Sequence, residues 1–306
     1  MLQHFVPQTY LKRFAIKEKN NYFVYTYDKK TGHQFKTNIN QVAAQTDIYK
    51  LKKADNENAW EEFYSRYIEQ DLNDFLSYMI KQYEINVIRN SASVFNDKDK
   101  VRAALHIINQ LYRGISALDY EKSIRPLLKP QLRKEGVDLA KQYGIDDKSV
   151  DELLEDEDIW RLSYAKQAII PENHLVLFAH LVNRNWVLFK TSNDSFITSD
   201  SPIVFFNQQN NLVGEFEAGI GSESTVIFYP ISSRLLIGMY AHDDIFSFLN
   251  VFDNKLVLLD DKDDFIDSVN FLQLRQCRRQ VYAKNVEHLY KLKQKYKHQK
   301  YGGLIK

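Results

Sequence analysis

The stretch HFVPQTYLKRF, residues 4–14, places aromatic, apolar and basic side chains in a terminal segment of the kind that usually frays. Pro7 suits the first turn of a helix. The helix that follows would turn three residues inward, Tyr10, Leu11 and Phe14. His4 either donates to a backbone carbonyl and locks the terminus, or acts as a general acid or base near neutral pH. We expect this segment to pack against the sheet of the protein.

The composition is that of a globular chain. Of 306 residues, 44% are hydrophobic and 13% are aromatic, which supplies enough apolar surface for a sizeable core. The length is compatible with one large domain or two average ones. Because we find no internal repeat and no low-complexity linker, we expect one α+β domain over residues 1–306. The single cysteine, Cys277, cannot form an internal disulfide, so we expect a cytoplasmic location.

Charge and hydropathy exclude some partners and suggest others. The longest apolar runs, such as LVLFAHLV at residues 175–182, are too short to span a bilayer, so we expect no membrane partner. The formal net charge of +1 conceals two opposed segments. Residues 275–306 carry ten Lys or Arg against one acid, whereas residues 146–158 carry eight acids against one lysine.

Hydrophobic periodicity predicts the elements of the first half. Residues 22–38 alternate on both sides of the turn DKKTG and predict a β-hairpin. From about Trp60 the apolar residues recur at helical spacing, and a second helix starts at Asn96–Asp97. Helical sequence continues to about Ala168. We therefore predict a helical insert over residues 58–168.

Extended sequence dominates the second half. Residues 174–259 are rich in Val, Ile, Phe and Trp between turn signals and predict an antiparallel β-rich core. Within this core, residues 185–200 predict a hairpin across Ser192–Asp194, and residues 224–240 predict another. Residues 275–306 predict a basic C-terminal helix. The expected fold is an antiparallel sheet with a helical insert and flanking helices.

The clearest local signal for a site is FITSDSPIVFF, residues 196–206. Apolar strand residues lead into Thr198, Ser199 and Asp200. Pro202 then ends the strand ladder because it has no N–H to donate. The two hydroxyls and the carboxylate either cap the turn through hydrogen bonds to the backbone, or provide an acid, a base or a metal ligand.

Polar residues also gather on one side of the helix predicted over residues 101–113, namely Arg102, His106, Asn109, Gln110 and Arg113. At 100° per residue this side lies away from an apolar stripe made by Val101, Leu105, Ile108 and Tyr112. The polar side is either a solvated helix face or the wall of a cleft, where Arg113 would grip a phosphate or carboxylate. Glu69, beside the stripe of the preceding helix, is either a rim residue paired with a cation or a partly desolvated carboxyl with a raised pKa.

The C-terminal stretch interleaves tyrosines with lysines, among them Lys293 and Lys297. Lysines neutralise phosphates and tyrosines stack on bases, so the stretch is a candidate RNA- or DNA-binding segment. A solubilising tail, or a partner for the acidic segment 146–158, explains the same charges. Several enzyme classes are excluded, because the sequence has no P-loop, no GxGxxG, no HExxH and no GxSxG.

Three motifs together resemble a bacterial family, domain-of-unknown-function family 4238. Its members typically begin with His-x-Val-Pro-x-x-Tyr-Leu-x-x-Phe, as residues 4–14 do here. They place Thr-Ser-Asp-x-Pro after a strand, as residues 198–202 do, and end a later strand with a Phe-Pro-Leu-Ser-like pattern, matched by Pro230 and Ser232. YIEQDL around Glu69 and NQLYR ending at Arg113 also look like family sequence. The resemblance implies a map of sites and no mechanism, because the family has no assigned chemistry.

The chain departs from the family pattern at two positions. Gln3 stands where many members have a second histidine, which argues against a two-histidine metal site at the N-terminus. Ser201 stands where asparagine is common.

Polar motifs so far apart in sequence are most simply explained by one shared cleft, in which His4, Glu69, Arg113 and Asp200 converge. We hypothesise a cytoplasmic bacterial effector that hydrolyses nucleic-acid phosphodiesters in toxin or antiphage defence. Asp200 with Glu69 would hold Mg²⁺ or Mn²⁺ or act as a base, His4 would be a general acid or base, and Arg113 would clamp the phosphate. Seven further residues would bind the substrate: Tyr10, His106, Gln110, Thr198, Ser199, Lys293 and Lys297.

Two other hypotheses use the same residues. In one, the cleft belongs to a sensor or interaction module that binds a nucleotide, a peptide or nucleic acid without chemistry. In the other, the motifs only fix the N-terminus onto the sheet. The sequence leaves the substrate and the oligomeric state open.

The hydrolase hypothesis predicts that the purified protein cleaves end-labelled RNA or DNA, single- or double-stranded, when Mg²⁺ or Mn²⁺ is present. His4→Ala and Asp200→Ala should each abolish cleavage, because each removes a proposed catalytic group. Gel electrophoresis with and without metal measures the products. No cleavage under any condition favours the sensor hypothesis.

Overall fold

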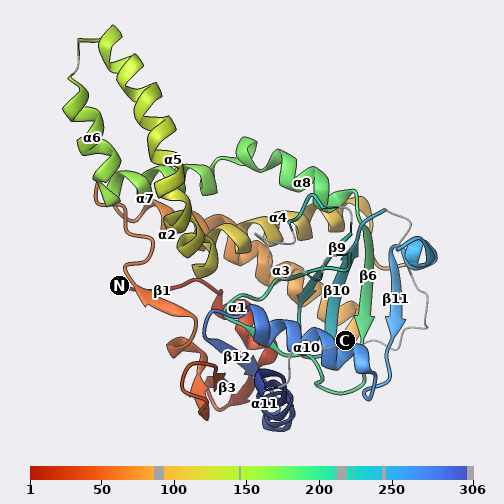
Figure 1. Ribbon diagram of the computed structural model, residues 1–306. Helices are drawn as coiled ribbons and strands as arrows, with labels where there is room; N and C mark the ends of the chain where they lie inside the picture. Colours follow the sequence, from red (N-terminus) through yellow and green to blue (C-terminus); the bar gives the residue numbers. More distant parts are fainter. Residues whose placement is uncertain are drawn as a thin grey trace.

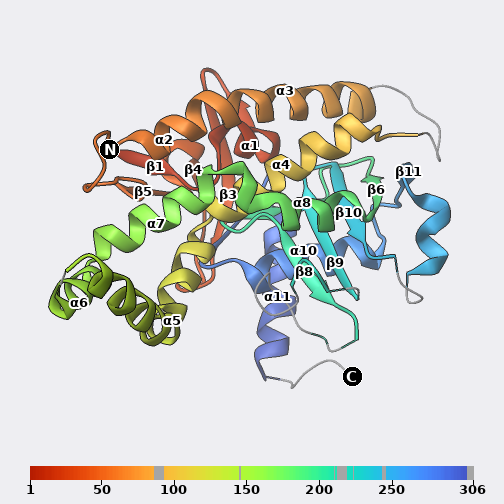
Figure 2. The same cartoon turned by 90° about the horizontal axis from the view of Figure 1, so that it is seen from above.

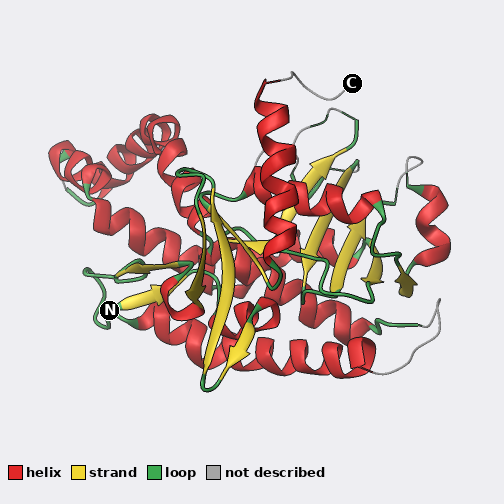
Figure 3. Ribbon diagram, turned by 90° about the horizontal axis from the view of Figure 1, so that it is seen from below, coloured by secondary structure: helices red, strands yellow, loops and turns green. Residues whose placement is uncertain are grey.

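The fold combines two five-stranded sheets, a two-stranded ribbon and a long run of helices (Figures 1 and 3). These statements refer to the residues that the computed structural model describes, 1–85, 93–144, 146–209, 211, 219–222, 224–242 and 246–301. The predicted α+β class is confirmed. No helix within these ranges has the length and apolar character needed to cross a membrane.

The first sheet, called the β6 sheet, has the strand order β11–β6–β10–β9–β8. Its strands are β6 (Asn185–Lys190), β8 (Val204–Asn207), β9 (Thr225–Pro230), β10 (Leu235–Tyr240) and β11 (Lys255–Leu258). All neighbours are antiparallel except β11 and β6, which run parallel. The hairpin predicted within residues 224–240 is confirmed, because β9 pairs with β10 and Leu236 faces Pro230.

Both faces of the β6 sheet are covered. Val187 and Phe189 of β6 pack in one cluster with Ile266 of α10 (Asp264–Gln276). Leu188, between them, belongs to the main core on the other face, with Ile107 of α4 (Asp97–Arg113). This alternation follows from the period of two in a strand. The result is a sheet enclosed between α10 and the helical layer.

The second sheet, called the β3 sheet, joins parts of the chain that are far apart in sequence. It has the order β2–β3–β12–β7, with β4 beside β3. Its strands are β2 (Ile16–Glu18), β3 (Asn21–Asp28), β4 (Gln34–Asn38), β7 (Thr198–Ser199) and β12 (Gln280–Ala283). The hairpin predicted over residues 22–38 is confirmed by the antiparallel pairing of β3 with β4.

The hairpin predicted across Ser192–Asp194 is wrong. β6 and β7 belong to different sheets, because both edges of β6 are occupied, one by β10 and the other by β11. Asp261 holds the connection between them by accepting hydrogen bonds from the backbone N–H of Asn193 (3.1 Å) and the hydroxyl of Ser195 (2.9 Å). Pairing between distant strands therefore overrides the local turn signal.

The helices predicted between residues 60 and 168 are present. α2 (Ala59–Phe63) and α3 (Glu69–Met79) are joined by a π-helical turn, and Asn96 begins α4 with a capping box to Asp99. Three more helices follow, α5 (Ile115–Gln142), α6 (Asp147–Glu155) and α7 (Glu157–Ile169). Figures 1 and 2 show α5 and α6 projecting from one end of the molecule.

Two predicted element types are wrong. Residues 175–182 were expected in the β-rich core but form α8 (Leu175–Val182), which packs against α4. A short apolar run does not by itself distinguish a helix from a buried strand. The basic helix expected over residues 275–306 begins only at Val286, as α11 (Val286–Tyr301), because β12 precedes it and pairs with β3. Residues 302–306 lie outside the described residues.

The N-terminal segment packs into the core, as predicted. β1 (Leu2–His4) pairs with β5 (Ala44–Thr46), and α1 (Gln8–Leu11) follows Pro7. Tyr10 has no exposed surface, and its ring stacks on Tyr229 at 5.5 Å. Its hydroxyl donates to the carbonyl of Pro230 in β9 (2.6 Å) and lies 2.8 Å from the hydroxyl of Thr198 in β7. One tyrosine hydroxyl therefore links the β6 sheet to the β3 sheet.

Replacing Tyr10 by phenylalanine should lower the free energy of unfolding by about 1–3 kcal/mol, because the buried carbonyl of Pro230 loses its donor while the ring stays. Urea denaturation followed by circular dichroism measures the change. Tyr67→Phe is the matched control, since Tyr67 is 67% exposed and should change stability little. Equal effects of the two substitutions would contradict the bridging role of Tyr10.

Candidate binding pocket

Arg113, at the C-terminal end of α4, brings two of the other predicted residues together. Its side chain is 1% exposed. One guanidinium nitrogen, Nη2, donates to Glu69 (3.0 Å) and to the backbone carbonyl of His4, and the guanidinium lies 4.5 Å from the ring centre of Tyr64. In the described part of the chain, Nε and Nη1 of Arg113 have no hydrogen-bond partner. The predicted convergence therefore occurs for three of the four residues, with His4 contributing its backbone.

The side chain of His4 is partly buried beside this cluster. Its Nε2 lies 3.4 Å from the side-chain amide of Gln8. Burial lowers the pKa of His4, and a hydrogen bond to the backbone of Ile39 opposes the shift. The ring is therefore mostly neutral at pH 7 and able to accept or donate one hydrogen bond.

The polar side of α4 is buried, so the interpretation as a solvated face is wrong. Gln110 donates to the carbonyl of Phe5 (2.9 Å), and His106 Nε2 lies 2.8 Å from Asp71 Oδ2. Burial lowers the pKa of His106 to about 4, against the attraction of Asp71. Two members of the supposed apolar stripe are instead exposed, Val101 (40%) and Leu105 (43%). The N-terminal segment and α3 cover the polar side. Buried carbonyls of the N-terminal segment receive hydrogen bonds from α4, and Asp71 of α3 lies beside His106.

Asp200 binds the backbone of the turn between α10 and β12. One carboxylate oxygen accepts the backbone N–H of Arg278, and the other accepts those of Arg279 and Gln280, all at 2.8 Å. Burial raises the pKa of Asp200 to about 6, while the three donors favour its ionised form. Ser199 lies beside it, with its hydroxyl 2.7 Å from Gln273. These contacts are those of a cap, and they hold the turn between α10 and β12.

The surroundings of Asp200 and Glu69 do not fit Mg²⁺ or Mn²⁺. The oxygens of Asp200 face three N–H groups, and Oε1 of Glu69 faces the guanidinium of Arg113. A divalent cation needs free oxygen ligands. Among the described residues, no group of three or more His, Cys, Asp or Glu side chains is arranged to hold a metal.

Two of the lysines of α11 make contacts within the protein. Lys293 donates to the carbonyl of Gly32 (2.8 Å), and Lys295 lies 3.8 Å from Asp267. The side chain of Lys297 lies outside the described residues. Among the described residues, the acidic segment 146–158 makes no ion pair with α11, and its carboxylates contact other cations, such as Arg133 of α5. Figures 1 and 2 show α6 and α11 at different ends of the molecule.

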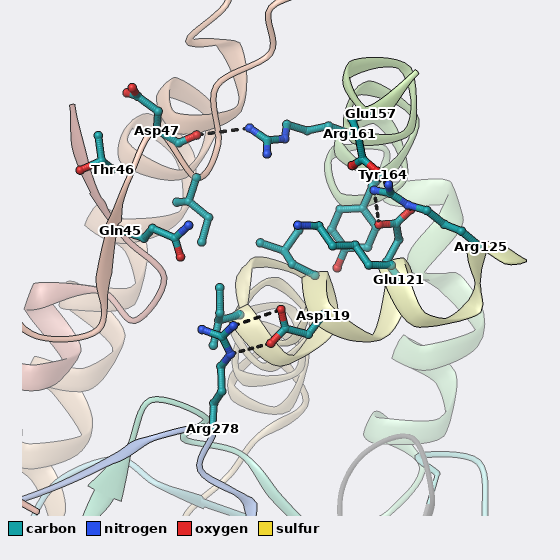
Figure 4. Close-up of a pocket in the computed structure, with 14 residues that line it drawn as sticks. Gln45, Thr46, Asp47, Asp119, Glu121, Arg125, Glu157, Arg161, Tyr164 and Arg278 are labelled. Carbon is teal, nitrogen blue, oxygen red and sulfur yellow. Dashed lines mark hydrogen bonds and ion pairs between the residues drawn. The ribbon is translucent and has the colours of Figure 1, made fainter. Parts of the chain in front are cut away.

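A pocket of about 340 Å³ lies where β5, α5, α7 and the α10–β12 turn meet (Figure 4). Its apolar residues are Ile48, Ile115, Leu118 and Tyr164. Its polar and charged residues are Gln45, Thr46, Asp47, Asp119, Glu121, Lys122, Arg125, Glu157, Arg161 and Arg278. The pocket thus offers an apolar wall and several charged groups.

Most charges around the pocket are paired with each other. Arg125 contacts both Glu121 (2.8 Å) and Glu157 (2.6 Å), and Arg278 contacts Asp119 (2.5 Å). Arg161 differs, because it donates only long hydrogen bonds (3.4 Å) to the backbone carbonyls of Asp47 and Lys50. Within the described residues, neither Arg161 nor Lys122 has a carboxylate within ion-pair distance. Both charges still act on Glu157, whose pKa is lowered first by its hydrogen bond from Arg125 and then by the nearby charges of Lys122 and Arg161. Arg161 and Lys122 are therefore the lining cations with the fewest close contacts.

The sequence motifs frame this pocket. Gln3 of β1 faces Gln45 of β5, and its side chain accepts the N–H of Tyr49 (2.8 Å). The hydroxyl of Tyr49 donates to the carbonyl of Arg113 (2.6 Å), immediately before α5 begins. Asp200 fixes the backbone of Arg278. Gln3, Arg113 and Asp200 thus each help to position one wall, although none of the three lines the pocket.

The lining residues were not among those predicted from the sequence. Arg125 and Glu121 have the i, i+4 spacing of an ordinary helix pair. Arg161 is a single arginine on α7 with no motif around it. Nothing in the local sequence distinguishes them from surface charges. The pocket is assembled from four distant segments, so no single stretch contains its signal.

Replacing Arg113 by lysine should lower the free energy of unfolding by about 2–3 kcal/mol, because an ammonium cannot reach both Glu69 and the carbonyl of His4 or lie flat on Tyr64. Arg133→Lys is the matched control. Arg133 is half-exposed and pairs with Asp151, so its loss should cost less than about 1 kcal/mol. Denaturant unfolding measures both; similar losses would contradict a central role for Arg113.

Comparison with known proteins places the chain in a family. No curated protein and no solved structure matches it. A family model described as "Protein of unknown function (DUF4238)" matches residues 2–287. The match includes the N-terminal segment, Glu69, Arg113 and the Asp200 cap. The chain therefore belongs to this family of proteins of unknown function.

Proposed function

We propose that this protein is a non-catalytic binding module whose ligand bears an anionic group and occupies the pocket between β5, α5, α7 and Arg278. The observation that carries the proposal is the pair of cations, Arg161 and Lys122, that line the pocket with no carboxylate of the described residues within ion-pair distance. Phosphate and carboxylate are the groups that arginine and lysine bind best.

The size and the wall of the pocket restrict the ligand further. A volume of about 340 Å³ is at the small end of ligand pockets, which favours a ligand no larger than a mononucleotide. The apolar residues, among them Ile48 and Leu118, suit a ring or another apolar part of the ligand. A nucleotide combines such a part with an anionic group.

The contacts of the motif residues support binding over the hydrolysis predicted from the sequence. A metal-dependent hydrolase needs Asp200 and Glu69 free for a cation, but both face N–H donors. It also needs Arg113 to reach a substrate phosphate, but that side chain is 1% exposed. Cleavage of RNA or DNA with metal present would favour the hydrolase.

The cytoplasmic location and the role in toxin or antiphage defence stay predictions.

Matched ligands test the proposal. Isothermal titration calorimetry compares adenosine with AMP and uridine with UMP, and each nucleotide should bind at least ten times more tightly than its nucleoside, because only the nucleotide carries the phosphate. Arg161→Gln should remove most of this difference. Circular dichroism verifies that the variant is folded.

Arg133→Gln is the control, since it removes an arginine charge from α5 outside the pocket and should leave the affinity unchanged. Equal affinity for nucleotide and nucleoside, with a dicarboxylate such as glutarate also failing to bind, would refute the proposal. An unchanged affinity in Arg161→Gln would place the ligand elsewhere.

A further inference from the structure

Five basic residues form one surface beside the pocket, here called the cationic ridge: Lys29, Lys30, Arg275, Arg278 and Arg279. They come from the turn between β3 and β4, from the last turn of α10 (Arg275) and from the turn between α10 and β12. The turns lie side by side, because the N–H of Lys29 donates to the carbonyl of Arg279 (2.8 Å) and Gln280 pairs with Asp28.

Most of the ridge is open to solvent. Lys30, Arg275, Arg278 and Arg279 are exposed, while the ammonium of Lys29 caps the carbonyls of Leu274, Arg275 and Cys277 at the end of α10. Three carboxylates oppose these charges, and one of them, Asp200, is buried beneath the turn near Lys29. Asp28 pairs with Arg279 (2.7 Å), and Asp119 pairs with Arg278 (2.5 Å). The ridge keeps a net positive charge, and each paired arginine has N–H groups left to donate.

The ridge and the pocket share Arg278. This residue lines the pocket with its side chain, and its backbone is held by Asp200. Lys122 also lines the pocket and adds a cation at this side of α5. A ligand with one phosphate in the pocket would therefore have the positive charges of the ridge available for phosphates that lie outside the pocket.

We propose that the pocket holds the terminal nucleotide of a single-stranded nucleic acid, whose next phosphates lie on the cationic ridge. This inference rests on the proposed binding function and names its ligand. The pocket is too small for a base pair but has an apolar wall for one base, and single-strand binding commonly combines apolar contact to bases with cations along the backbone. We favour the ridge over α11 as the nucleic-acid surface because Arg278 of the ridge lines the pocket, whereas no described residue of α11 does.

Fluorescence anisotropy with a labelled ten-nucleotide RNA or DNA tests the inference. The linear single strand should bind at least ten times more tightly than the mononucleotide, and its affinity should fall with salt because phosphates release counterions. A circular single strand of the same sequence should bind at least ten times more weakly, since it offers no end to the pocket. A blunt duplex should also bind weakly.

A double substitution tests the ridge itself. Arg275→Gln with Arg279→Gln should weaken oligonucleotide binding at least tenfold and reduce the salt slope by about one to two, while mononucleotide binding in the pocket is unchanged. Lys129→Gln with Arg133→Gln, on α5 outside the pocket, removes the same charge and should have little effect.

The outcomes separate this inference from the function on which it rests. If mononucleotides bind but the linear strand binds no more tightly, or the circular strand binds equally well, the inference fails and the pocket proposal stands. If the two double variants weaken oligonucleotide binding equally, the ridge contributes only non-specific charge, and the inference is overturned. If mononucleotide, oligonucleotide and glutarate all fail to bind, both proposals fail; if only glutarate binds, this inference fails and the pocket proposal stands.

Discussion

A single buried hydroxyl, that of Tyr10, connects the two sheets of this protein. It donates to β9 of the β6 sheet and contacts Thr198 in β7 of the β3 sheet. The preceding residues depend on distant helices in the same way, since α4 supplies donors to the carbonyls of His4 and Phe5. Buried carbonyls need such donors, so the N-terminal segment, the helices and both sheets have to assemble together.

This constraint changes the meaning of the polar motifs. Residues that look like acids, bases and phosphate clamps in the sequence bind the protein's own backbone in the structure, Arg113 at His4 and Asp200 at the α10–β12 turn. A buried charge is costly unless it is paired and hydrogen-bonded. Its placement therefore fixes the surrounding segments closely, and here those segments form the walls of the pocket.

The electrostatic features are separated in space. The acidic residues of α6 pair with basic residues such as Lys129 and Arg133 of the adjoining α5, at the projecting end of the molecule (Figures 1 and 2). The cationic ridge lies at the α10–β12 turn, where Asp28, Asp119 and the buried Asp200 oppose its five cations. Ion pairs exposed to water are weak, so the exposed Arg278–Asp119 pair beside the pocket can be exchanged for contacts to a ligand at little cost.

The sequence by itself determined the elements whose signals are local. The apolar spacing of α3, the Asn96 start of α4, the β3–β4 and β9–β10 hairpins and the inward face of Tyr10 all depend on residues within a few positions of each other. The capping role of Asp200 was one of two interpretations that its position after a strand allowed.

Only the tertiary structure decided the rest. It separated β6 and β7 into different sheets, made a helix of residues 175–182, buried the polar side of α4 and gathered the pocket from four segments. The physical reason is the same in each case. Strand pairing and burial depend on which distant surface lies opposite, and that surface is not encoded in the neighbouring sequence.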